Sequence, residues 1–202
     1  MPEVSIVREK LIDPNKFSRP GMPCSRHGAA IHWGFTPGLS AMDWRNRFNS
    51  AQAGPRKAGY AYFVAWDGIV QAVPDNEMTY HVGAYHYFPW ILERFGSDPN
   101  KHLIGVLISH RENVYGEYDH VTLRNAVELL AWKSLTYGWN PRKDILQHSQ
   151  ITGKGIGSPY DDEETLPCPR YFVSNPIAWW DFLKSIEARK VELEIERKDR
   201  ES

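Results

Sequence analysis

The sequence has little of several features that would assign a protein to a class at once. Two cysteines, Cys24 and Cys168, are too few for a disulfide framework in 202 residues. Lys and Arg total 24 against 25 Asp and Glu, so no excess of positive charge favours nucleic acid or an anionic membrane. No apolar run approaches the roughly 18 residues of a membrane span, and the N-terminal residues MPEVSIVREK lack the apolar segment of a secretory signal. We therefore expect cytoplasmic synthesis and no nucleic-acid or membrane partner.

The remaining composition is that of a globular domain. Hydrophobic residues make up 42% of the chain and charged residues 24%, and there are eight His and eight Trp. A chain of this length forms one ordinary domain. From Ile186 onward 11 of 17 residues are charged. We therefore divide the chain into a folded domain at 1–185 and a charged helix end or linker at 186–202.

Apolar runs predict the strands. Residues 29–33 are a short apolar run that indicates a buried strand. Residues 60–66 and 69–73 flank Asp67-Gly68, a two-residue hairpin signal. Residues 103–109 are almost continuously apolar, which is typical of a central strand buried on both faces.

Three segments have helical periodicity. The first begins at Ser40, with Asp43 as a capping partner, has apolar residues at Trp44, Phe48 and Ala51, and ends at Gly54-Pro55. The second is apolar at Leu123, Val127 and Leu130 and stops near Gly138. The third begins at Asn175-Pro176 and is apolar at Trp179, Phe182, Leu183 and Ile186. Strands that alternate with helices predict an α/β fold, a central mixed β-sheet flanked by helices on both faces.

Three side chains are candidate metal ligands. His32 lies in a predicted strand, His148 follows an apolar segment, and Cys168 stands between two prolines. Two imidazoles and a thiolate would form a zinc site of the catalytic type, with one coordination position open. No spacing rule joins these three positions, so a structural role for each of them remains an alternative.

Six motifs occur in an order that resembles one family. They are IHW at 31–33, GYAYFVAWDG at 59–68, YHVGA at 80–84, LIGVLISH at 103–110, HSQITGK at 148–154 and CPRYF at 168–172. Together they resemble the type 2 N-acetylmuramoyl-L-alanine amidases, the family of phage endolysin catalytic domains and peptidoglycan recognition proteins. The resemblance runs from about residue 18 to residue 184 and implies a mixed sheet with zinc at the floor of a groove.

The resemblance implies a cofactor and a reaction. His32, His148 and Cys168 match the residues that bind Zn²⁺ in the family. The family hydrolyses the amide between the lactyl group of N-acetylmuramic acid and L-alanine, so peptidoglycan is the implied partner. An endolysin of this kind is made in the cytoplasm of a phage-infected cell and acts on the cell wall after release.

Four further residues receive roles from the same resemblance. Tyr60 matches a tyrosine near the metal, and Lys154 matches a lysine that stabilises the oxyanion. His81 and Trp33 stand where family members line the substrate groove. A core tyrosine, a solvated lysine and core aromatic residues are the structural alternatives.

The sequence departs from the family pattern at four positions near the metal motifs. Leu107 replaces a glutamate that acts as general base in many members, and Ala61 replaces His or Asn. Gln150 replaces an aspartate, and Gly34 stands where threonine is common. Loss of a general base typically lowers a rate by about 10²–10⁴-fold. We expect a roomier and less polar pocket over the metal, and an amidase activity that is weak or absent.

Two other functions fit these departures. The chain can be a zinc-bearing scaffold whose apolar pocket was reshaped, by evolution or by design, for another reaction. It can also be a peptidoglycan-binding protein without catalysis. An amidase of the endolysin type is the function that the motifs favour.

Overall fold

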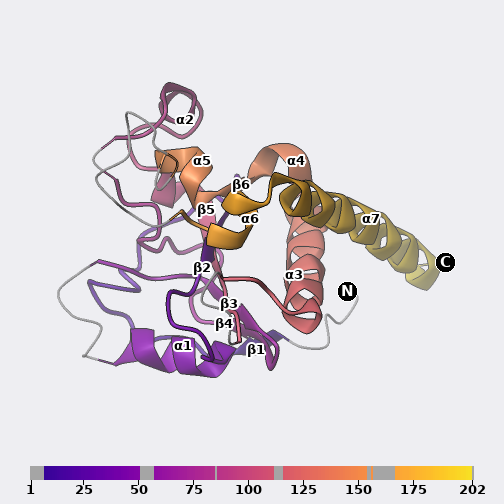
Figure 1. Cartoon of the computed structure of the whole chain (residues 1–202), viewed down its shortest axis with the longest axis horizontal. Coiled ribbons are helices and arrows are strands. Elements are labelled where there is room, and N and C mark those ends of the chain that lie inside the picture. The colour runs from indigo at the N-terminus through magenta and orange to yellow at the C-terminus, as the bar shows by residue number, and fades with distance from the viewer. Residues whose placement is uncertain are drawn as a thin grey trace.

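The computed structural model describes residues 7–50, 57–84, 86–111, 116–153, 156 and 167–201. In these ranges helices alternate with the strands of one sheet (Figure 1). The strands are β1 (Val7–Glu9), β2 (Gly28–Trp33), β3 (Tyr62–Ala65), β4 (Gly68–Gln71), β5 (Leu103–Ile108) and β6 (Ile145–Gln147). The α-helices are α1 (Ala41–Asn49), α2 (Pro89–Phe95), α3 (His120–Tyr137), α4 (Pro141–Asp144), α5 (His148–Thr152), α6 (Arg170–Ser174) and α7 (Pro176–Glu201), with a 3₁₀ turn at Pro99–Lys101.

The six strands form one sheet in the order β1-β4-β3-β5-β2-β6. Strands β3 and β4 pair antiparallel as a hairpin, and every other pair of neighbours is parallel. The hairpin turns at Asp67-Gly68, where Gly68 has a φ of 122° that a side chain would disfavour. The predicted mixed sheet and its hairpin are confirmed.

The middle of the sheet is its most apolar part. All six residues of β5 are buried, as are all six of β2 beside it. A strand with neighbours on both sides and helices on both faces has no solvated face, so its sequence shows no alternation. The central position predicted for residues 103–109 is therefore correct.

Helices cover both faces of the sheet. The largest apolar cluster joins one face to α3 and α7, with Val106, Leu129 and Phe182 among its members. The other face carries two smaller clusters, one with Trp44 of α1 and one with Ile91 of α2. The covering helices confirm the predicted layers.

Capping residues set the ends of α1 and α3. The Ser40 side chain accepts from the Asp43 backbone N–H and the Asp43 side chain accepts from Ser40, so the predicted capping box forms. Helix α1 ends at Asn49, and the predicted end at 54–55 lies outside the described residues, as does Ala51. Helix α3 ends at Tyr137, and the next residue, Gly138, terminates it with a left-handed φ of 69°, as predicted.

Helix α7 is the longest element and includes the charged C-terminal stretch. Leu193 is buried and Arg189 forms an ion pair with Glu128 of α3, so the helix packs on α3 well beyond residue 186. The division of the chain at residue 185 stays a prediction. Across the described ranges, no helix combines the length and the apolar character needed to cross a bilayer.

Candidate metal centre

Parallel strand pairing brings His32 and His148 together. Strand β6 pairs with β2 through Ala29↔Ile145, Ala30↔Leu146 and Ile31↔Gln147. His32 is the next residue of β2, and His148 is the next residue after β6 and the first of α5. The two imidazole centroids lie 4.6 Å apart. The carboxyl ends of adjacent parallel strands, where ligands bind in α/β sheets, thus supply both histidines.

Ser149 holds Cys168 beside this pair. Its hydroxyl donates to the Cys168 carbonyl over 2.8 Å and accepts from the Cys168 backbone N–H over 3.0 Å. The Ser149 backbone N–H donates to the same carbonyl. Because Ser149 follows His148 directly, these bonds fix the cysteine backbone next to the second histidine. The Cys168–Pro169 peptide bond is cis.

The three candidate ligands form a compact buried cluster. Their ligand atoms all lie within 4.8 Å of one another, and each residue is buried. The Cys168 Sγ is 3.7 Å from Nδ1 of His32. A tetrahedral zinc with Zn–N of about 2.05 Å and Zn–S of about 2.3 Å separates such ligands by about 3.6 Å. Two imidazoles and a thiolate at this spacing fit zinc.

Tyr60 lies against the cluster. Its ring meets the His32 imidazole edge to face, with centroids 5.0 Å apart. Burial, with the charge of Cys168 as the second cause, raises the pKa of the Tyr60 phenol. The hydroxyl therefore stays protonated at neutral pH and can donate a hydrogen bond near the metal ligands. Lys154, the other residue with an expected catalytic role, lies outside the described residues.

The two residues expected to line the substrate groove are both buried. Trp33 follows His32 and points to the opposite face of β2, where it belongs to the large core cluster and stacks on His110. His81 is 5% exposed and lies behind His32, within hydrogen-bond distance of it. Burial lowers the pKa of His81 to about 4. Both side chains are thus almost fully buried.

Leu107 lies directly beside His32. The two residues are register partners on β5 and β2 and therefore share a face of the sheet. Leu107 belongs to the apolar cluster that contains Trp44 and Phe63. Ala61 is also buried and joins the large core. At the position where the family resemblance implies a general base, this chain thus has apolar packing.

Gly34 and Gln150 have structural explanations. A Cβ at Gly34 would lie 2.4 Å from the Trp44 ring, so the indole fills the space that a side chain would take. The expectation of a roomier pocket over the metal stays a prediction. The Gln150 side chain accepts from the Gln147 backbone N–H over 2.8 Å and caps α5.

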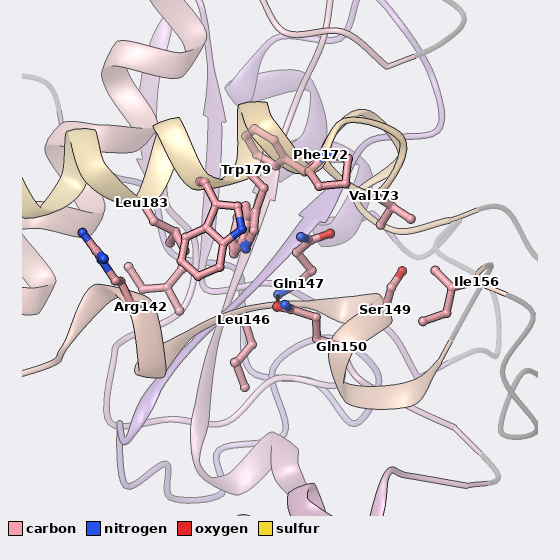
Figure 2. Close-up of a pocket in the computed structure, with 13 residues that line it drawn as sticks. Arg142, Leu146, Gln147, Ser149, Gln150, Ile156, Phe172, Val173, Trp179 and Leu183 are labelled. Atoms are coloured by element: carbon pink, nitrogen blue, oxygen red, sulfur yellow. Dashed lines mark hydrogen bonds between the residues drawn. The ribbon is translucent and has the colours of Figure 1, made fainter.

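A cavity lies on the other side of α5. Its volume is about 270 Å³, and its lining residues come from β6, α5, α6 and α7 among others. Figure 2 shows these residues around it. Gln147 and Ser149 line this cavity, whereas His148, which stands between them in the sequence, does not. Trp179 and Leu183 supply its apolar wall. The cavity is therefore separate from the candidate metal centre.

Sequence reasoning missed the residues that support the ligands. Ser149 and Asn100 are ordinary polar residues in the sequence, and their partners lie far away along the chain. The Asn100 side-chain oxygen accepts from the backbone N–H groups of His81 and Val82. No local pattern marks such a role, because the fold alone brings the partners together.

Known proteins resemble both the sequence and the fold. The chain is 31% identical over 156 residues to a probable N-acetylmuramoyl-L-alanine amidase of Bacillus licheniformis, covering 76% of this chain and 43% of that protein. It thus spans less than half the length of this relative. The fold is similar to PlyL, with a TM-score of 0.67, 17% identity and coverage of 89% and 96% of the two chains. It is also similar to the catalytic domain of XlyA, with a TM-score of 0.64, 20% identity and coverage of 89% and 98%.

A family model matches more than half of the chain. It is described as N-acetylmuramoyl-L-alanine amidase and matches residues 25–162. That range includes His32, Tyr60, His81 and His148, whereas Cys168 lies just beyond it. The structure brings Cys168 to the two histidines independently of that match. With most of its length matched, the chain belongs to the N-acetylmuramoyl-L-alanine amidase family.

Proposed function

We propose that the chain is the catalytic domain of a zinc-dependent amidase that cleaves the lactyl–L-alanine amide of peptidoglycan, as a phage endolysin does. The observation that carries the proposal is the buried cluster of His32, His148 and Cys168, in a chain of this family. When bound there, zinc supplies a Lewis acid that activates water and polarises the scissile carbonyl. The cell wall is then the place of action.

The protein residues have distinct tasks in this proposal. His32, His148 and Cys168 hold the metal through one atom each. The protonated Tyr60 hydroxyl donates a hydrogen bond to the oxygen on which negative charge develops. Lys154 supplies a positive charge for the same oxygen, as its match to the family implies. Leu107 cannot accept a proton, so we expect turnover about 10²–10⁴-fold below that of a site with a base there.

Release of new amino groups from purified Gram-positive cell walls tests the proposal. Amidase cleavage exposes the amino group of L-alanine, which can be labelled and identified after acid hydrolysis. We expect the wild-type protein to release it slowly and Cys168→Ser to release none. New reducing sugars, or release that is equal in the two proteins, would contradict the proposal.

The packing of Leu107 favours a second candidate, a wall-binding protein without catalysis. Its apolar neighbours Trp44 and Phe63 leave that position without any group that moves protons. A binding protein would sediment with walls and release no L-alanine amino groups at any enzyme concentration. Slow release that depends on Cys168 would exclude this candidate.

A further inference from the structure

The His81 imidazole is held on both of its nitrogens. Its Nδ1 lies 3.2 Å from Nε2 of His32, and its Nε2 lies 3.0 Å from the Leu103 carbonyl oxygen. Asn100 accepts from the backbone N–H of His81 and that of Val82, which fixes the segment that carries the ring. His81 therefore links the backbone of β5 to a candidate metal ligand.

Hydrogen-bond chemistry assigns the direction of each bond. A carbonyl oxygen only accepts, so His81 Nε2 carries the proton and donates it to Leu103. A neutral imidazole has one proton, so His81 Nδ1 is an acceptor and Nε2–H of His32 is its donor. The lone pair of His32 is then on Nδ1, the nitrogen that faces the Cys168 sulfur at 3.7 Å.

A glycine in β5 makes room for this ring. A Cβ at Gly105 would lie 2.7 Å from Cγ of His81 and 2.8 Å from its Cδ2. Contacts this short cannot be relieved without a shift of the imidazole. Gly105 is buried in the centre of the sheet, so the strand backbone has little freedom to move away. The absence of a side chain at 105 thus allows His81 to approach His32.

We propose that His81 is a positioning residue that fixes the tautomer and ring orientation of His32, so that Nδ1 of His32 faces the metal. The inference rests on the proposed metal centre. Histidine ligands of metals in proteins usually donate their second N–H to a fixed acceptor, and loss of that acceptor typically lowers metal affinity about 10–100-fold. Here the acceptor is a second imidazole anchored on a backbone carbonyl.

The tautomer of His32 can be measured without any metal. In the metal-free protein, long-range ¹H–¹⁵N spectra distinguish a protonated from an unprotonated imidazole nitrogen. We expect His32 to be protonated at Nε2 and unprotonated at Nδ1. A proton on Nδ1 would overturn the inference, whether or not the protein binds zinc.

Two substitutions of His81 by an amide residue test its two side-chain hydrogen bonds one at a time. In His81→Asn the side-chain oxygen takes the place of Nδ1 and can still accept from His32. In His81→Gln the amide nitrogen takes the place of Nε2 and can still donate to Leu103, but nothing accepts from His32. We expect zinc affinity, measured by competition with a chromophoric chelator, to fall about 10–100-fold in His81→Gln and several-fold less in His81→Asn. Equal losses in the two variants would overturn the positioning role.

Gly105→Ala tests the same role with His81 left in place. The added methyl group should displace the ring and lower zinc affinity, whereas Gly83→Ala, where a Cβ meets nothing within 4 Å, should leave it unchanged. Unchanged affinity in Gly105→Ala would contradict the inference. Failure of the wild-type protein to bind zinc would instead overturn the proposed metal centre, and the spectra of the metal-free protein would still decide the tautomer.

Discussion

An apolar side chain lies next to His32 where the family resemblance implies a general base. Leu107 is the register partner of His32 on the neighbouring strand, so a carboxylate there would lie beside the metal ligands. The position is buried among apolar groups. Burial raises the pKa of a carboxyl group toward neutrality, which suits a general base.

Leu107→Glu should therefore increase the rate of L-alanine amino-group release from cell walls, by about 10²-fold or more. It should also lower the free energy of unfolding by about 1–3 kcal/mol, because a polar group is buried without a partner. Leu107→Gln is the matched control, because glutamine has the size of glutamate but cannot act as a general base. An equal gain in the Gln variant, or no gain in the Glu variant, would show that a base at 107 is not what limits the rate.

Individual residues were predictable where family motifs carry them, and unpredictable where tertiary contacts decide. No fixed sequence spacing relates His32, His148 and Cys168. The parallel register of β2 and β6 brings the two histidines together, and the sequence alone does not show this pairing. The burial of His81 behind His32 and the contact of Gly34 with the Trp44 ring both depend on segments distant in sequence. No local pattern could have indicated either contact.

Among the elements, α5 matters most for the site because it joins two ligands. It begins at His148, and its second residue holds the backbone of Cys168 through the Ser149 hydroxyl. The Ser149 hydroxyl is buried. An alanine at 149 would leave the Cys168 backbone N–H without its hydrogen-bond acceptor. A shift of Cys168 would then change the distance between the sulfur and the imidazoles.

Ser149→Ala should lower the free energy of unfolding by about 1–3 kcal/mol, the cost of an unsatisfied buried group. It should also reduce zinc affinity about tenfold, as the loss of a group that orients a ligand does. Ser185→Ala, an exposed serine on α7, is the control and should change stability by less than about 0.5 kcal/mol. Urea unfolding and chelator competition measure the two effects, and unchanged zinc affinity in Ser149→Ala would contradict this role.

Elements with a long apolar run, a clear helical period or a turn signal were predictable, and the shortest elements without such signals were not. The apolar run of β5 and the periodicity of α3 extend over enough residues to show their type. Strand β6 has three residues between two short helices, which is too few for a period to emerge. Its place at the sheet edge depends on pairing with β2, a long-range contact. The element that positions His148 was thus among those that the sequence did not predict.

At the scale of the whole molecule, a buried ion pair joins the sheet to α3. Asp75, shortly after β4, accepts from Lys133 and from the hydroxyl groups of Tyr62 and Tyr137. Burial lowers the pKa of Lys133, and the carboxylate of Asp75 opposes that shift. The network joins the sheet to α3, so its loss should lower the stability of the whole domain.

Lys133→Met should lower the free energy of unfolding by about 3–5 kcal/mol, because it leaves a largely buried carboxylate without its cation. The double variant Lys133→Met with Asp75→Leu removes both charges. Its free energy of unfolding should fall by less than that of the single variant. Urea unfolding followed by tryptophan fluorescence measures both. A double variant less stable than the single one would show that packing, not charge, dominates this interface.

The proposed chemistry requires one zinc ion bound by His32, His148 and Cys168. Elemental analysis of the purified protein, beside Cys168→Ser and the control Cys24→Ser, tests it most directly. We predict one zinc per chain in the wild type and in Cys24→Ser, and none in Cys168→Ser. No zinc in the wild type, or full zinc in Cys168→Ser, would contradict the account.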